Sequence, residues 1–588
     1  MLLCLVVQHP IFVQLKKYIP ILEWLPNYKA STLKKDLPAG LTIGIIMIPQ
    51  GLAYAMIAGL PPIYGLYAAL LPQFIYALLG TSRQLSVGPV AMDSLLVASG
   101  IGALSLADPS DYLSVAIFLA LFMGCVQFLL GVLRMGFLVN FLSKPIISGF
   151  TSAAALIIGF SQLKYLTGAE IERSNVFHNI VQNTLDKINE TNMTSLWIGL
   201  AGIAIIYGLK KWKKSFPGAL LVVVASIVFM YMSGLDQTGV DIVGKIPEGL
   251  PSFQVPSITQ DQFWEIAPFA FALALVAFTE AISIGKSIEH QHDDYKINPN
   301  QELRALGISN IVGSFFMSYP TTASFSRSAI NNEVGAKTGM ASIIGAVIIA
   351  LTLLFLTPLF FYLPKPILAS VVMVSVFGLI DLKYPIQLLK RRPDEFLSLV
   401  ITFLATLFIG IIAGIIIGIL FSLLLLVYRT AKPHIAELGR VGESDYFKNV
   451  ERFEDVNERE DLLVLRFDSQ LYFGNTDFFK TELTRRVERK KGKLSAIILN
   501  AESINYIDST GAIVLCNVIK EYKVKEIQFF ITGAIGPTRD ILLKSGVMKE
   551  LGEDYLFVKT HEAVDFIDRG VGKNEIQDKI ARQTKKEK

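Results

Sequence analysis

The sequence contains few charged residues for its length. Of its 588 residues, 18% are Asp, Glu, Lys or Arg, whereas soluble globular domains carry about 25%. Hydrophobic residues make up 52%, and the mean hydropathy is +0.49. This composition excludes a disordered, collagen-like or ordinary cytosolic protein and indicates a chain that crosses a membrane several times.

Cysteine is also scarce, with only Cys4, Cys125 and Cys516. Their spacing suggests neither a disulfide framework nor a zinc site. The cluster Glu289 to Asp294 (EHQHDD) is better explained as a solvated loop than as a metal site. A net charge of +4 is too small to indicate a nucleic-acid partner.

No nucleophile elbow, Walker loop or dinucleotide fingerprint occurs in the sequence, so an enzyme has no supporting motif and an ATP-driven pump is disfavoured. We expect no cofactor apart from a coupling Na⁺ or H⁺. Residues 1–7 have no basic stretch of the signal-peptide kind, and we therefore expect insertion through the chain's own spans.

The charges that are present are unevenly distributed. Of the 104 charged residues, 51 follow residue 440. This predicts a cytoplasmic or interfacial segment over 1–40, a transmembrane domain over 41–430, a soluble domain over 440–572 and a flexible tail over 573–588. With about 20 apolar residues needed for each span, fourteen spans are predicted at 41–58, 63–80, 86–101, 112–133, 137–163, 195–209, 218–233, 264–285, 302–317, 326–337, 340–358, 366–380, 396–411 and 412–428.

The distribution of Lys and Arg predicts the orientation, because cytoplasmic loops are enriched in them. The loop 234–263, expected outside, is acidic, and an even number of spans places both termini in the cytoplasm. The expected location is the cell inner (plasma) membrane. The loops expected inside carry Lys29, Lys34, Lys35, Arg83, Arg134, Lys210, Lys211, Lys213, Lys214, Lys390, Arg391 and Arg392.

Two of the predicted spans, 86–101 and 326–337, are short and irregular. The segments Gly80 to Ser94 (GTSRQLSVGPVAMDS) and Tyr319 to Asn332 (YPTTASFSRSAINN) are rich in Gly, Pro, Ser and Thr, and one lies in each half of the membrane body. Paired interrupted spans at matching positions are typical of inverted-repeat transporters. A further break is expected in the first span at Ile48-Pro49-Gln50-Gly51, because proline frees a carbonyl group.

Such interrupted spans can create an anion site. Irregular backbone is tolerated at bilayer depth only where protein or a water-filled cavity satisfies it. A half-helix that begins there directs unpaired N–H groups and about half a positive charge into that cavity. Two such N-termini that face one another would bind an anion with the main chain alone. Ser, Thr and Gly would cap the helices and let an oxyanion approach closely.

Charged residues inside predicted spans are costly and are candidates for function. Arg327, in the first turn of the second half-helix, would add a full positive charge to the anion site; the alternative is that it extends to the membrane interface. Glu280 suits proton or sodium coupling, and the alternative is a structural carboxylate paired with Arg327 or a helix N-terminus. Asp93 would either modify the anion site or point away from it towards water.

Five motifs occur in order along the chain and together resemble the signature of the sulfate permease (SulP) family of anion transporters. One departure is Ala323, where many members carry Gly at or near this position, and it leaves the substrate open. The motifs are Pro49 to Tyr67 (PQGLAYAMIAGLPPIYGLY), Gly80 to Arg83 (GTSR) with Ser86 to Pro89 (SVGP), Asn300 to Asn310 (NQELRALGISN), Ser324 to Asn331 (SFSRSAIN) and Gly335 to Thr338 (GAKT).

The resemblance implies two intertwined inverted repeats of seven spans. A core would comprise spans 1–4 and 8–11, a gate spans 5–7 and 12–14, and the core would move against the gate like an elevator. The resemblance also implies a homodimer, a coupling role for Glu280, and a substrate site between the N-termini of spans 3 and 10. By motif position, the substrate-binding residues would be Gln50, Tyr54, Gly88, Val90, Ser324, Phe325, Ser326 and Arg327.

The soluble part alternates strand and helix patterns, which indicates an α/β domain with buried strands. Strands are predicted at 462–467, 496–500 and 527–532, and helices at 476–490 and 511–522.

Within this part, Asn505 to Gly511 (NYIDSTG) resembles the Asp-Ser-Ser/Thr-Gly turn of STAS domains, relatives of bacterial anti-sigma-factor antagonists. The resemblance implies a regulatory turn, phosphorylated at Ser509 or Thr510, and a cytoplasmic protein partner. A phosphate would be stabilised at a helix N-terminus. The alternative, which we favour, is that Ser509 caps the helix and Asp508 supports the turn.

These features predict a secondary active transporter for a small oxyanion, sulfate by family name, coupled to H⁺ or Na⁺. Within transport, the alternatives are a bicarbonate or C4-dicarboxylate symporter, and an uncoupled exchanger or channel. An alternative from another class is a membrane anion sensor that signals through the STAS domain.

Overall fold

The computed structural model describes residues 16, 18–102, 104, 108–137, 143–172, 174, 176–212, 216–292, 294–490 and 492–569. Cys4, Lys213, Lys214, residues 1–15 and 17 of the segment predicted over 1–40, and the tail predicted over 573–588 lie outside these residues. The described chain forms two compact units that divide between Ser422 and Leu423.

The first unit is helical, and each of the fourteen predicted spans overlaps a helix of the structure. Among the described residues, seven helices are long and apolar enough to cross a membrane, and four more are apolar but shorter. The predicted class, a polytopic helical membrane protein followed by a small α/β domain, is confirmed.

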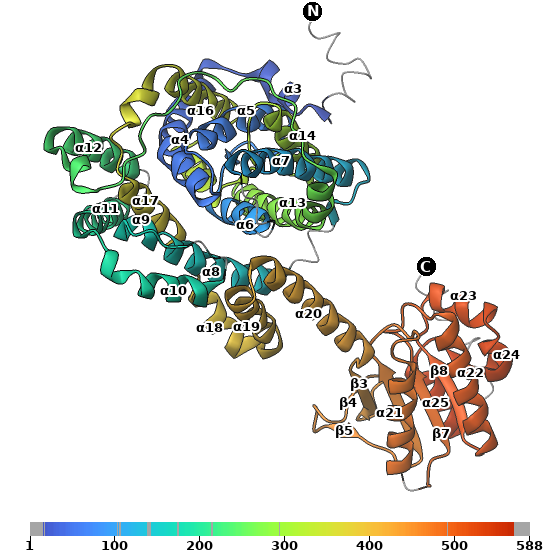
Figure 1. Ribbon diagram of the computed structural model, residues 1–588. Coiled ribbons are helices and arrows are strands. Elements are labelled where there is room, and N and C mark those ends of the chain that lie inside the picture. The colour runs from blue at the N-terminus through green and yellow to red at the C-terminus, as the bar shows by residue number, and fades with distance from the viewer. Residues whose placement is uncertain are drawn as a thin grey trace, which may run out of the picture. The chain divides into compact units, whose positions relative to one another are not determined.

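The helices of the first unit form two bundles. One contains the helices of predicted spans 1–4 and 8–11, and Figure 1 shows its blue members beside its green and yellow ones. Its helices are α4 (Ala30–Ile57), α5 (Ile63–Leu79), α6 (Ala91–Gly102), α7 (Pro109–Val132), α13 (Gln260–Glu289), α14 (Pro299–Ser314), α15 (Phe325–Val334) and α16 (Met340–Leu351), with a π-helical turn over Thr352–Leu356.

The second bundle contains the helices of predicted spans 5–7 and 12–14, with short connecting helices between them. Contacts of α6 with α8, and of α4 with α12 and α17, join the two bundles. The second bundle comprises α8 (Lys144–Ser161), α9 (Leu163–Thr167), α10 (Phe177–Asp186), α11 (Met193–Trp212), α12 (Gly218–Ser233), α17 (Lys365–Phe377), α18 (Lys383–Arg391), α19 (Pro393–Phe408) and α20 (Ile411–Ala431).

Helix α4 differs from its prediction in two ways. It begins at Ala30, well before residue 41, and it continues through Pro49. The expected break at 48–51 is therefore wrong. Proline is tolerated inside a membrane helix where neighbouring helices satisfy the freed backbone groups, and residues 46–57 of α4 are all buried. The packing is closest at Gly65 of α5, where a β-carbon would overlap the carbonyl of Gly51.

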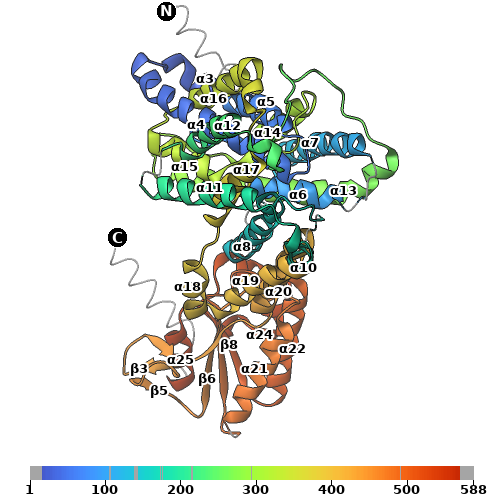
Figure 2. The same ribbon diagram turned by 60° about the vertical axis from the view of Figure 1, so that its left-hand side comes forward.

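The two half-helices are short members of the first bundle. Helix α6 has 12 residues and α15 has 10, so neither spans a bilayer alone at 1.5 Å per residue. Each is the third spanning element of its series of seven, and each follows a two-residue strand, β1 (Val87–Gly88) or β2 (Thr322–Ala323). Figure 2 shows α15 beside α4, with which it is in contact.

The second unit is an α/β domain around one sheet. The strands run in the order β4-β3-β6-β7-β8-β9, with β5 also paired to β3; β6 to β9 are parallel and β3 is antiparallel to β6. Its strands are β3 (Ile435–Val441), β4 (Phe447–Asn449), β5 (Val456–Asn457), β6 (Leu462–Phe467), β7 (Ala496–Asn500), β8 (Gln528–Thr532) and β9 (Leu556–Phe557). Its helices are α21 (Thr476–Arg489), α22 (Ser509–Val524), α23 (Gly536–Lys544), α24 (Val547–Leu551) and α25 (Thr560–Arg569).

Alternate residues of the central strands face two different cores. Leu463 and Ile497 pack with the cluster that contains α21, α22 and α24. Val464 and Ile498 pack with the cluster that contains Val564 of α25. Both faces are covered, which explains the continuous apolar runs 462–465 and 496–499 in these strands.

A charged cluster lies just after β6. Asp468 accepts hydrogen bonds from Arg466 (Nη2, 3.0 Å) and Ser503 (3.2 Å), and His434 Nδ1 lies 2.9 Å from its Oδ2. Burial acts to raise the pKa of Asp468, but the hydrogen bonds from Arg466 and His434 outweigh it and hold the pKa below its usual value.

Candidate anion-binding site

The segments that precede the two half-helices are hydrogen-bonded to each other. Strands β1 and β2 pair antiparallel, with Val87 opposite Ala323 and Gly88 opposite Thr322. The N–H of Ser324 extends this ladder by donating to the carbonyl of Ser86 at 2.9 Å. Helix α6 begins three residues after β1 and α15 two residues after β2, so the ladder brings both N-termini to one place in the bundle.

Arg327 lies at this place and is completely buried. Its Nη1 donates to Gln50 Oε1 at 3.1 Å and to the carbonyl of Pro89 at 3.0 Å, and its Nε donates to Ser86 Oγ at 3.3 Å. The Nη2 has no hydrogen-bond partner among the described residues. The alternative in which Arg327 extends to the membrane interface is therefore wrong.

The surroundings of this guanidinium hold it in place and leave its charge uncompensated. The groups that accept its hydrogen bonds are an amide, a hydroxyl and a carbonyl, and within the described residues it forms no ion pair. A buried cation is strongly destabilising unless it is paired. The free Nη2, together with the two helix N-termini, therefore presents an electropositive place for an anion.

The other predicted substrate residues fall into two groups. Gln50, Tyr54 and Ser324 are buried, and Tyr54 lies close enough to interact electrostatically with Arg327. Phe325 is 58% exposed and Ser326 is also exposed.

Ser324 and Val90 stand just before the two half-helices. The Ser324 hydroxyl accepts a hydrogen bond from the N–H of Arg327 at 3.5 Å and caps α15. The carbonyl of Val90 accepts from the N–H of Ser94 in the first turn of α6, at 2.9 Å.

Gly88 lies against the guanidinium in a backbone conformation, with φ at +156°, that side chains rarely adopt. A β-carbon at this position would lie 3.4 Å from Arg327 Nη2 and 3.3 Å from Met47 Cε. A larger side chain would occupy space beside Nη2, which has no hydrogen-bond partner among the described residues. Glycine therefore keeps this face of Arg327 accessible.

Sequence reasoning missed four contributors. Ser86 and the carbonyl of Pro89 hold the guanidinium, and the hydroxyls of Ser94 and Tyr319 lie 3.1 Å apart beside it. Ser86 and Pro89 belong to the SVGP motif, so the sequence marked them as candidates. Their role depends on the pairing of β1 with β2, which no local pattern reveals.

Among the described residues, Glu280 forms no hydrogen bond or ion pair with Arg327, whose Nε and Nη1 donate to other groups and whose Nη2 has no partner. Its charged neighbour is instead Asp93, close enough for the two carboxylates to repel each other. Asp93 is completely buried, so the expectation that it turns back to water is wrong. Among the described residues, neither oxygen of Asp93, nor Oε2 of Glu280, has a hydrogen-bond partner.

The acidic and histidine-rich segment 289–294 makes structural contacts where it is described. Glu289 accepts a hydrogen bond from the N–H of Ile297 at 3.1 Å, and His292 Nε2 lies 2.6 Å from Asn332 Oδ1. Asp294 forms an ion pair with Arg83 at 2.6 Å. Asp293 lies outside the described residues.

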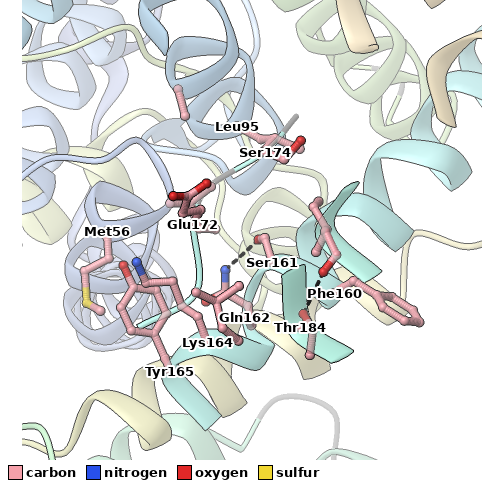
Figure 3. A pocket seen from close by; sticks show the side chains of 14 residues that line it. Met56, Leu95, Phe160, Ser161, Gln162, Lys164, Tyr165, Glu172, Ser174 and Thr184 are labelled. Atoms are coloured by element: carbon pink, nitrogen blue, oxygen red, sulfur yellow. Dashed lines mark hydrogen bonds between the residues drawn. The ribbon is translucent and has the colours of Figure 1, made fainter. Parts of the chain in front are cut away.

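A small cavity of about 50 Å³ lies between the two bundles. It is lined by Met56 of α4, Leu95 of α6 and residues from α8 to α10. Figure 3 shows Lys164 and Glu172 among the side chains around it. The predicted substrate residues are not among its lining.

In the second unit, the turn before α22 is capped by Asp508 and not by Ser509. Asp508 Oδ1 accepts from the N–H of Gly511 at 2.7 Å, and its Oδ2 accepts from the N–H of Phe473 at 2.9 Å. Ser509 and Thr510 are exposed in the first turn of the helix. The expected cap at Ser509 is therefore wrong by one residue.

The fold and the paired half-helices define a polytopic helical membrane transporter. The chain belongs to the sulfate permease family, whose pattern matches residues 33–402, and residues 454–565 match the STAS domain.

A similar curated relative is "Sulfate transporter 4.1, chloroplastic" from Arabidopsis thaliana, 36% identical over 585 residues that cover 95% of this chain and 84% of that protein. Among solved structures, the murine Slc26a9 anion transporter in the inward-facing state superposes with a TM-score of 0.87 at 26% identity, covering 95% of both chains. The transmembrane domain of a cyanobacterial bicarbonate transporter, BicA, shares the fold with a TM-score of 0.59 at 22% identity, covering 67% of this chain and 98% of that one.

Proposed function

We propose that this protein carries sulfate, or a small oxyanion like it, across the membrane as a proton-coupled secondary active transporter. The observation that carries the proposal is the buried Arg327 guanidinium, whose free Nη2 lies where the N-termini of α6 and α15 meet. Relatives that are named as sulfate transporters support sulfate as the substrate.

The proposed site would recognise an oxyanion in two ways. The Nη2 of Arg327 donates a charge-assisted hydrogen bond, which is stronger than a neutral one. The first N–H groups of each half-helix donate further hydrogen bonds and add their partial positive charge. Gln50, Ser86 and the Pro89 carbonyl hold the guanidinium beforehand, so binding costs little ordering of the site.

Elevator-like movement of the first bundle against the second is supported by the packing. Backbones within the first bundle approach closely: a β-carbon on Gly124 of α7 would lie 2.7 Å from the carbonyl of Gly307 in α14. Close packing of this kind favours movement as one rigid body. Because Arg327 and both half-helices belong to the first bundle, the substrate would travel with it.

Proton coupling through Glu280 is supported by the residues around it. A cavity of about 20 Å³ beside its carboxylate is lined otherwise by Thr279 and by apolar residues of α8, α13 and α20. A sodium ion needs several oxygen ligands, and this lining offers few. We therefore favour a proton over Na⁺ as the coupled ion.

The remaining expectations stand as parts of the proposal. The transmembrane domain would span 41–430 and the STAS domain 440–572. The chain would form a homodimer in the inner (plasma) membrane with both termini in the cytoplasm, and the exposed hydroxyls of Ser509 and Thr510 would offer a regulatory contact for a cytoplasmic partner.

Purified protein in liposomes tests the proposal. We expect uptake of radiolabelled sulfate to be driven by an inward proton gradient and not by a sodium gradient at fixed pH. Labelled bicarbonate and fumarate are tested in the same way, to identify the preferred anion. Uptake that is indifferent to both gradients would favour an exchanger or channel. Sulfate binding without any flux would overturn transport and favour a sensor.

A further inference from the structure

Asp93 occupies an unusual position for a carboxylate. It is the third residue of α6, in the first turn of a half-helix that begins inside the first bundle. Its side chain is completely buried, and neither oxygen has a hydrogen-bond partner among the described residues. A buried, unpartnered carboxylate is costly when ionised, so its presence calls for an explanation.

Glu280, on the adjacent helix α13, is the acidic neighbour of Asp93. Its Oε2 is likewise buried without a partner. Like charges repel strongly where water is excluded, because the effective dielectric constant is low. Two carboxylates in one such place therefore keep at least one proton between them, as in acid–carboxylate pairs generally.

The charge of Asp93 also decides how attractive α6 is to an anion. The N-terminus of a helix carries about half a positive charge. An ionised Asp93 in the first turn would more than cancel it and would repel an oxyanion held by Arg327. A protonated Asp93 would leave the N-terminus free to bind the anion.

We propose that Asp93 and Glu280 form a proton-binding pair that controls the charge at the N-terminus of α6, so that the oxyanion binds tightly only when Asp93 is protonated. The inference rests on the proposed function and adds to it the residue that links the two ions. The linkage is reciprocal: a proton on Asp93 strengthens anion binding, and a bound anion strengthens proton binding by the same factor. The proton comes from water and no covalent bond between heavy atoms changes.

A proton suits this pair better than a metal ion, because the cavity beside Glu280 is otherwise lined by Thr279 and apolar residues. Thr279 Oγ1 donates to the carbonyl of Leu275 at 2.7 Å, and Ser94 Oγ lies 3.1 Å from the Tyr319 hydroxyl. The two carboxylates alone would offer too few oxygens to replace the water around a sodium ion.

Among the described residues, Tyr319 interacts electrostatically with Asp93, and also with Arg327 and Tyr54, which interact with each other. On the remaining helices packed against α6, Tyr112 of α7 donates to the carbonyl of Ala58 and Lys144 of α8 lies over the ring of Tyr384. Neither provides a counter-charge for Asp93.

The test is the pH dependence of sulfate affinity, measured by calorimetry on the full chain in detergent at pH 5.5 and pH 8. For the wild type we expect affinity to fall by roughly tenfold or more as the pH rises, within the usual range of coupling between two sites. For Asp93→Asn we expect less than a twofold change, with binding at pH 8 tighter than in the wild type. Asp111→Asn, an exposed aspartate in the first turn of α7, is the matched control and should keep the wild-type dependence.

A wild-type pH dependence in Asp93→Asn would overturn the inference while leaving the proposed function intact. Restoration of affinity at pH 8 by sodium chloride, but not by potassium chloride, would also overturn it in favour of a metal ion. If Asp93→Asn fails to fold, Glu280→Gln is measured by the same criterion, since removal of either carboxylate must weaken the dependence. Absence of sulfate binding by the wild type at both pH values would overturn the proposed function itself.

Discussion

Replacing Arg327 by methionine should separate the contribution of its charge from that of its volume. The side chain is buried and its Nη2 is the donor that the described residues leave free. A hydrogen bond to a charged group contributes about 1.5–3 kcal/mol, and loss of the remaining Coulomb attraction brings the total to roughly 2–4 kcal/mol. At 1.4 kcal/mol for each factor of ten, sulfate affinity should fall by about 30- to 700-fold.

The same substitution should not unfold the membrane unit. It leaves Gln50 Oε1 and the Pro89 carbonyl without their donor, at about 1–3 kcal/mol for each buried acceptor, but it also removes a buried charge, which is itself costly. We therefore expect a lower melting temperature, with a folded protein and weak residual binding from the two helix N-termini. Arg327→Lys keeps the charge but not the planar guanidinium, so its sulfate affinity should lie between those of the wild type and Arg327→Met.

Calorimetric titration with sulfate, beside thermal unfolding of the same preparations, provides the measurement. Arg304→Met is the matched control, because Arg304 lies in the same bundle and donates to the carbonyl of Gly131 in α7. It should affect stability and leave affinity unchanged. Binding by Arg327→Met within threefold of the wild type would refute the assignment of Arg327 to the anion site.

Three further results are expected. Gly65→Ala should abolish folded expression in size-exclusion chromatography, because its methyl group would overlap the backbone of the facing helix. The control Gly208→Ala has open space around it and should be tolerated. Equal behaviour of the two variants would contradict the packing argument. Asp508→Ala should destabilise the STAS domain by about 1 kcal/mol in thermal unfolding of the full chain, and Ser509→Ala should not; the reverse order would restore the serine cap. Because the pKa of Asp468 is lowered in the folded state, the stability it supplies is present above its unfolded value near 3.9 and is lost as pH falls through the folded value. Amide hydrogen exchange in β6 of the wild type should therefore become faster in acid than the intrinsic pH dependence of exchange explains. This acceleration should be smaller in Asp468→Asn. An equal acceleration in the two proteins would count against a stabilising role for the Asp468 carboxylate.

Much of the fold could be predicted because its signals are local. Strands β6 and β7 were predicted with their observed bounds, since an apolar run between turn residues suffices to define a buried strand. The two half-helices could be located because glycine, proline and hydroxyl residues interrupt otherwise apolar segments. The prediction of a break at Pro49 was wrong for a related reason: proline weakens a helix locally, but the burial of residues 46–57 of α4 depends on distant segments.

The site was harder to predict than the fold. Arg327 and Ser324 could be identified from the sequence, but the partners of the guanidinium come from residues about 240 to 280 positions away. The pairing of Glu280 with Asp93, in place of Arg327, depends on how α13 packs against α6. A sequence pattern gives the position of a charge along one helix, and the neighbour it meets is decided by tertiary packing.

The two-residue ladder between β1 and β2 limits which changes in length this protein can tolerate. Side chains alternate along a strand, so a single inserted residue near Val87 or Ala323 would turn each following side chain to the opposite side. Ser86 would then no longer meet Arg327, although every amino acid of the site would still be present. Alterations of substrate preference, in nature or by design, should therefore arise by substitution at fixed length, and insertions should be confined to loops that lie outside this pair of strands.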